Sequence, residues 1–74
     1  MRARRRPTRR QLEVLAAYAR TGSYKITAEE LGITAGTVST TLRMVRARYE
    51  VETTIQAYRV FVLSATYEKR TPIV

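Results

Sequence analysis

The chain has 74 residues, a net charge of +8 and a pI of about 10.9, and it contains no Cys and no His. This length allows one small domain, and the positive charge favours DNA, RNA or another polyanion as a partner. The composition excludes disulfides, zinc sites built on Cys or His, and His-dependent catalysis, and no apolar run is long enough to span a membrane. With no catalytic triad and no phosphate-binding glycine loop either, we expect no enzyme activity, no metal site and no cofactor.

Residues 1–7 are predicted to form a basic flexible arm. Six of the fourteen positive residues lie among the first ten, whereas the other eight nearly balance the six glutamates. Pro7 blocks helix continuation from upstream, and the neighbouring arginines repel one another. The arm is either a solvated tail or a DNA contact through Arg4, Arg5 and Arg6, which would reach phosphates or the minor groove.

A first helix is predicted from Thr8 to about Thr21, at the start of a domain that covers residues 8–66. Thr8 and Gln11 have the spacing of a capping box, and Gly22 suits the left-handed residue that ends a helix. Apolar residues recur here at helical spacing, which predicts a core-facing stripe. The residues expected in that stripe are Leu12, Leu15, Ala16 and Ala19, with Val14 and Tyr18 in a second stripe.

Residues 23–39 have the pattern of a helix-turn-helix. A short helix is predicted over 24–31, with Ala28 and Leu31 inward. Gly32 then turns the chain, Ile33 fills the corner, and Thr34 caps a second helix over 35–49. The alternative interpretation is a helical hairpin inside an ordinary bundle.

The predicted helix 35–49 has one buried stripe and one basic face without any acid. The stripe follows i, i+4, i+7 and i+11, and its residues are Val38, Leu42, Val45 and Tyr49. The other face carries Ser39, Thr40, Arg43 and Arg46. Gly36, in the first turn, would let the backbone approach a phosphate. A basic helix held at a fixed angle by a small partner helix is what a protein needs to enter a DNA major groove.

A fourth helix is predicted from Glu52 or Thr53 to Thr66, followed by an irregular tail over 67–74. Its apolar residues outnumber what one core-facing stripe can hold, so self-association is the simplest cover for the rest. Ala57 and Phe61 are expected to face the core. The candidate dimer contacts share another face and are Ile55, Tyr58 and Val62. The alternative is that the whole helix is internal.

These elements together resemble the tetrahelical DNA-binding domain of the LuxR/GerE type over roughly residues 8–62. The matching segments are Thr8–Leu15, Ala28–Val38, Leu42 and Val45, then Val51 and Gln56-Ala57. The resemblance implies a small all-α helix-turn-helix fold whose fourth helix is commonly the dimer surface. It implies base contacts by Ser39, Thr40 and Arg43. It implies phosphate contacts by Thr34, Thr37, Arg46 and Arg48.

The leading functional hypothesis is a stand-alone, sequence-specific transcriptional regulator that binds double-stranded DNA as a homodimer. Such a protein would be cytoplasmic and associated with the nucleoid. A second hypothesis is a phage or plasmid protein for DNA packaging or DNA architecture, in which the arm and phosphate contacts dominate. A third is a module similar to sigma region 4, which would bind RNA polymerase through the apolar fourth helix.

Overall fold

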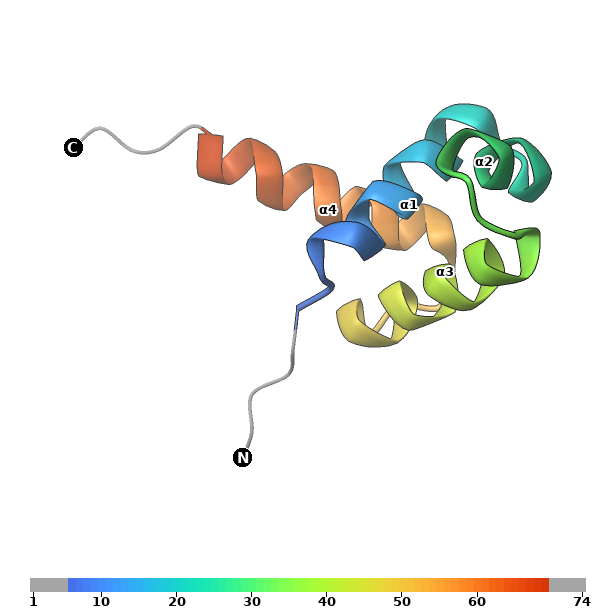
Figure 1. The fold of residues 1–74 in the computed structure, drawn as a ribbon. Helices are drawn as coiled ribbons and strands as arrows, with labels where there is room; N and C mark the ends of the chain where they lie inside the picture. The colour runs from blue at the N-terminus through green and yellow to red at the C-terminus, as the bar shows by residue number, and fades with distance from the viewer. Residues whose placement is uncertain (1–5, 70–74) are drawn as a thin grey trace.

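A computed structural model of the chain describes residues 6–69, with side chains described up to residue 64. Within this range the chain forms α1 (Arg9–Thr21), α2 (Tyr24–Leu31), α3 (Ala35–Tyr49) and α4 (Thr54–Lys69), and no strand. The predicted all-α, four-helix fold is therefore confirmed (Figure 1).

Hydroxyl caps begin the helices. The Thr8 side chain accepts from the Gln11 backbone N–H at 3.1 Å, and the Gln11 side chain accepts from the Thr8 N–H at 2.9 Å. This is the predicted capping box. Ser23 and Thr34 cap α2 and α3 without a reciprocal bond, by accepting from the backbone N–H groups of Ile26 and Thr37. A second reciprocal pair joins Thr53 and Gln56 at the start of α4.

Left-handed residues end the first three helices. Gly22 and Gly32, which end α1 and α2, have φ of 69° and 70°. Both are conformations that glycine adopts without steric cost. The residue that ends α3 is Glu50, with φ of 61°. The sequence carries no glycine there, so the helix end at Tyr49 was predicted from the apolar stripe alone.

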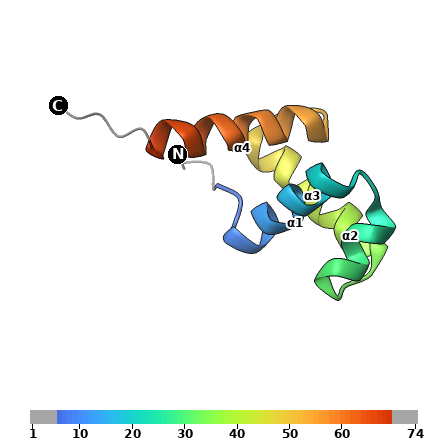
Figure 2. The same cartoon turned by 90° about the horizontal axis from the view of Figure 1, so that it is seen from above.

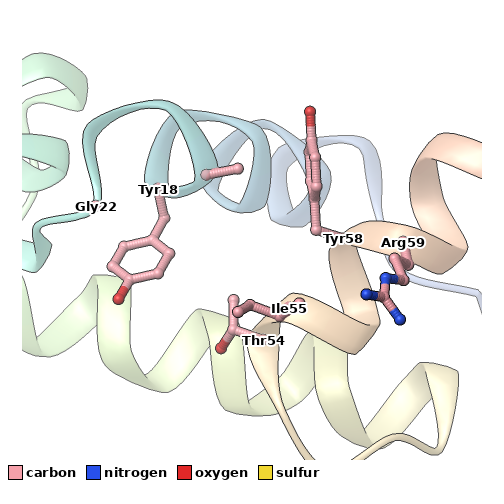
Figure 3. Close-up of a pocket in the computed structure, with 7 residues that line it drawn as sticks. Tyr18, Gly22, Thr54, Ile55, Tyr58 and Arg59 are labelled. Carbon is pink, nitrogen blue, oxygen red and sulfur yellow. The ribbon is translucent and has the colours of Figure 1, made fainter.

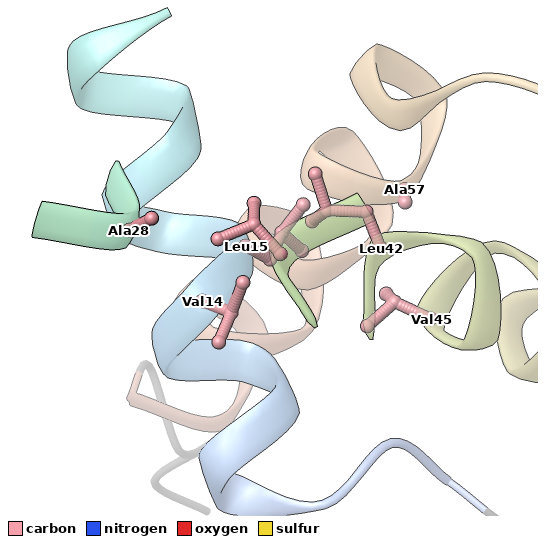
Figure 4. Packing of buried hydrophobic residues seen from close by; sticks show 7 residues of the cluster. Val14, Leu15, Ala28, Leu42, Val45 and Ala57 are labelled. Carbon is pink, nitrogen blue, oxygen red and sulfur yellow. The ribbon is translucent and has the colours of Figure 1, made fainter. Parts of the chain in front are cut away.

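One hydrophobic core joins all four helices (Figure 4). Its buried members are Val14, Leu15, Ala28, Val38, Leu42, Val45 and Ala57. Leu12, Leu31, Ile33, Tyr49 and Phe61 are half-buried and pack against this cluster. The predicted stripe of α3 is thus correct, and so is the inward direction of Ala28 and Ala57.

The predicted core face of α1 is wrong in part. Leu15 is fully buried, but Ala19 is exposed, Ala16 is only half-buried, and Val14 and Ala17 are buried instead. The reason is that α1 contacts α2, α3 and α4. A helix with three neighbours buries a wide face, which includes Val14 of the predicted second stripe and excludes Ala19 of the first.

The fourth helix is longer than predicted. It continues to Lys69, so the irregular tail expected from residue 67 is wrong for residues 67–69, and residues 70–74 lie outside the described range. The first residue that would block a helix is Pro72, which explains why nothing stops α4 at Thr66. Figures 1 and 2 show that the C-terminal part of α4 extends past the other helices.

Candidate nucleic-acid interface

Helix α3 contacts the other three helices along one side and leaves its opposite side open. Val38, Leu42 and Val45 are fully buried toward those helices. The exposed side carries Thr40 and Arg43. Figure 1 shows α3 at the lower edge of the molecule, with α1 and α4 above it. A whole helix face is therefore accessible to a large partner.

The exposed face of α3 carries a positive charge at Arg43 and no negative charge. The helix contains Arg43, Arg46 and Arg48 and no acidic residue. Arg43 is exposed and makes no hydrogen bond or ion pair with the rest of residues 6–69. The structure thus leaves the guanidinium of Arg43 available, and Thr40 is exposed beside it. Ser39, the third predicted base contact, is half-buried at the border of the face.

The first turn of α3 is also open. The Thr34 hydroxyl accepts from the Thr37 N–H at 3.0 Å and donates to the Thr37 hydroxyl at 3.0 Å, and both residues are exposed. A Cβ on Gly36 would meet only the Thr34 hydroxyl, at 3.8 Å. Packing inside the domain does not require glycine at this position, and the backbone of this turn carries no bulky side chain.

Two of the predicted phosphate-binding arginines are partly occupied within the domain. Arg46 Nη1 donates to the Thr54 hydroxyl at the start of α4, at 3.1 Å. Arg48 Nη1 donates to the main-chain carbonyl of Arg6, at 3.0 Å. Both arginines are half-buried. Sequence reasoning missed these contacts, since no local pattern shows which distant residue a helix face meets.

The predicted arm contacts are only partly within the described residues. Arg6 is exposed, whereas Arg4 and Arg5 lie outside the described range. Arg6 lies close enough to Tyr49 for its charge to lower the pKa of that phenol, while the larger effect of burial raises the same pKa. The root of the arm therefore lies beside the C-terminal end of α3.

Acidic side chains of α1 and α2 are partly paired with arginines. Arg20 of α1 forms a bidentate ion pair with Glu30 of α2, at 2.7 and 3.2 Å. The hydrogen bond from Arg20 lowers the pKa of the Glu30 carboxyl. Arg10 and Glu13 form a second pair on the surface of α1. The Arg20–Glu30 pair joins α1 to α2, whereas α3 itself contains no acidic residue.

The predicted dimer residues form an exposed apolar face on α4. Ile55, Tyr58 and Val62 are 70%, 37% and 38% exposed. The alternative of a wholly internal helix is therefore wrong. A groove of about 460 Å³ adjoins this face between α1 and α4 (Figure 3). Its lining residues are Tyr18, Ala19, Gly22, Thr54, Ile55, Tyr58 and Arg59.

Metal sites and membrane spans are absent from the part of the chain that the structure describes. Among residues 6–69, no three His, Cys, Asp or Glu side chains gather in a way that would hold a metal ion. In the same range, every helix is too short or too polar to cross a membrane.

Comparison with protein families identifies the fold independently. Residues 9–66 match the model of the bacterial regulatory helix-turn-helix proteins of the LysR family. The match supports the helix-turn-helix DNA-binding domain expected from the sequence. The matching family is the LysR family, so the predicted LuxR/GerE subtype is not supported. No curated protein matches the chain, and no solved structure matches it.

Proposed function

The chain belongs to the LysR family of bacterial regulatory helix-turn-helix proteins, and from this membership we propose that it binds specific duplex DNA sequences as a dimer. DNA binding and transcription regulation follow from the family. The sequence specificity, the groove that is entered and the dimer are the proposal. The family is one of regulators, which favours this role over DNA packaging and over catalysis.

The observation that carries the proposal is the open, acid-free face of α3. Thr40 and Arg43 are exposed on it, and Arg43 has its guanidinium available. A guanidinium can donate two parallel hydrogen bonds to guanine O6 and N7 in the major groove, which reads a base and not only the backbone. We assign base contacts to Thr40, Arg43 and, at the border of the face, Ser39.

Phosphate contacts are proposed around the first turn and along the sides of α3. The exposed hydroxyls of Thr34 and Thr37 lie where the helix dipole and the free N–H groups favour an anion. Arg46 keeps donors beyond the one given to Thr54, because a guanidinium has five N–H groups. The arm, through Arg4, Arg5 and Arg6, adds further positive charge.

The dimer is proposed to form through the apolar face of α4. Ile55, Tyr58 and Val62 are exposed apolar residues on one face of the helix. Contiguous apolar patches of this kind mark surfaces that bind another protein. A second copy related by a two-fold axis would cover the same residues on both chains and close the groove beside Tyr58. The two α3 helices would then lie about one DNA turn apart, roughly 34–36 Å, over an inverted repeat.

Selection from random duplex DNA tests the proposal. The full chain is used to enrich bound duplexes, and the enriched site is then competed against a shuffled duplex at several salt concentrations. We expect the enriched site to be an inverted repeat. It should bind more tightly than the shuffled duplex at every salt concentration, although salt weakens binding to both. Recovery of no common sequence, with equal competition by both duplexes, would show that the protein binds DNA without reading it.

A further inference from the structure

The exposed side of α3 has an uncharged centre. At about 100° per residue, a line of uncharged residues runs along the helix within roughly 40° of Thr40. All members of this line are exposed, and the buried stripe of α3 lies on the opposite side of the helix. The members are Gly36, Thr40, Met44 and Ala47. The line that faces away from the core therefore carries one long side chain, that of Met44, and it is apolar.

The cations of α3 lie on both sides of this central line. By the same helical spacing, Arg43 lies roughly 60° to one side of Thr40, and Arg48 lies roughly 80° to the other. Arg46 is farther around the helix, where it donates to Thr54 of α4. A helix that enters the major groove turns its centre toward the base edges, and its flanks are nearer the two phosphate backbones. Charge at the flanks and none at the centre fits that orientation.

Met44 is the residue whose chemistry this central position explains. Its side chain is 41% exposed, one turn after Thr40 and next to Arg43. A single exposed apolar residue is ordinary on a protein surface, but this one lies on the line that faces the bases. Methionine is flexible and polarizable, so it adapts to a small apolar group of a partner. On the base edges in the major groove, that group is the 5-methyl of thymine.

We propose that Met44 reads a thymine by packing its side chain against the 5-methyl group of that base, near the guanine that Arg43 contacts. This inference rests on the proposed entry of α3 into the major groove, and it adds a specificity-determining residue that makes no hydrogen bond to a base. The discrimination comes from removing the methyl group and the thioether chain from water together. Each bound half-site should therefore contain a T·A pair close to the G·C pair.

Replacing thymine by deoxyuridine tests the inference, because this change removes only the 5-methyl group. Each thymine of the selected duplex is replaced in turn, and every duplex is titrated with the full wild-type chain and with Met44→Ala. At one thymine of the half-site, we expect the wild type to bind about threefold to fivefold more weakly, as for the loss of one buried methyl group. Met44→Ala should lose less than about 1.5-fold at the same position, because the two groups are coupled.

Three further variants separate an apolar contact from other effects of the substitution. Met44→Leu keeps an apolar chain and should keep most of the methyl effect. Met44→Gln keeps the length and the helix propensity of methionine but ends in an amide, so it should lose the effect. Leu63→Ala is the matched control, because Leu63 is 68% exposed on α4 and its loss should leave the methyl effect unchanged. Circular dichroism of each variant shows whether it is folded.

Two results would overturn the inference while base reading by α3 stands. One is a methyl effect that has the same size in wild type and Met44→Ala at every thymine. The other is a selected site that contains no thymine. Recovery of no common sequence from random duplexes would instead reject the proposed function and this inference together, so the two failures are distinguishable.

Discussion

The hydroxyls of Thr21 and Thr27 lie 2.6 Å apart and share a hydrogen bond that joins the end of α1 to the middle of α2. Thr27 is fully buried, and its hydroxyl is the donor in this bond, because the Thr21 hydroxyl has a single proton and gives it to the Ser23 carbonyl. Thr21 also donates to the Ser23 carbonyl and accepts from the Ser23 N–H. Thr21 therefore satisfies the buried hydroxyl of Thr27 and also holds the turn between α1 and α2 through the backbone of Ser23.

The two threonines are predicted to differ in their effect on stability. Thr27→Val removes the buried hydroxyl itself and should cost about 0.5–1.5 kcal/mol, whereas Thr21→Ala leaves that hydroxyl buried without its partner and should cost about 1–3 kcal/mol. In the Thr27→Val background, Thr21→Ala should cost less than it does alone. Urea unfolding of the four chains measures this. Strict additivity would show that the hydrogen bond contributes nothing to stability.

Arg43→Ala is predicted to weaken binding at the selected site by about 1–3 kcal/mol and to relax the preference at one base pair. The reason is that a bidentate contact to guanine is lost together with the charge. Selection from random duplexes with the variant measures the preference. Arg43→Lys is the matched control, because it keeps the charge and loses the planar fork. It should keep the salt slope and lose the preference. If Arg43→Ala weakens binding to all sequences equally, Arg43 contacts phosphate.

The helix bounds were largely predictable because they depend on neighbouring residues. Thr8 with Gln11, and Gly22 and Gly32 with the caps that follow them, fix starts and ends through contacts within a few residues. Where no such local feature exists, prediction failed. The end of α4 was placed three residues early, since the sequence after Thr66 contains neither glycine nor a cap.

The sequence predicts which side of α3 is exposed. It does not predict the hydrogen bonds that Arg46 and Arg48 make with other parts of the domain. The acid-free side of α3 follows from helical periodicity, and the structure confirms that Thr40 and Arg43 are exposed. The engagement of Arg46 by Thr54 and of Arg48 by Arg6 depends on where α4 and the arm lie. That placement is set by tertiary packing, which also broadened the buried face of α1.

The stability of the domain is predicted to fall above pH 10 partly through Tyr49. Burial raises the pKa of this phenol in the folded state above its ordinary value of 10.0, although the charge of Arg6 lowers it in part. The unfolded chain therefore loses this proton first as pH rises. The contribution is fully present below pH 10 and is lost between the unfolded and folded pKa values.

Tyr49→Phe is the control for this effect, because it keeps the ring and removes the ionising hydroxyl. The free energy of unfolding is measured for both chains from pH 8 to pH 11. The wild type should lose more stability than Tyr49→Phe over the alkaline part of this range. A difference between the two chains that stays constant with pH would contradict the prediction.

Tyr58→Asp is predicted to give a folded monomer with weaker binding to an inverted repeat. Tyr58 lies on the outward side of α4 between Ile55 and Val62, and it borders the groove toward α1. A carboxylate there would be buried against a second copy but solvated in the monomer, so it opposes association more than folding.

Ser64→Asp places the same charge at an exposed position of α4 and is the matched control. Sedimentation at tens of micromolar, with and without the selected duplex, measures the oligomeric state, and circular dichroism measures folding. We expect wild type and Ser64→Asp to form dimers on the duplex and Tyr58→Asp to occupy one half-site. A wild-type chain that is monomeric under both conditions and binds singly would end the dimer proposal, while base reading by α3 would remain to be judged from the Arg43 variants.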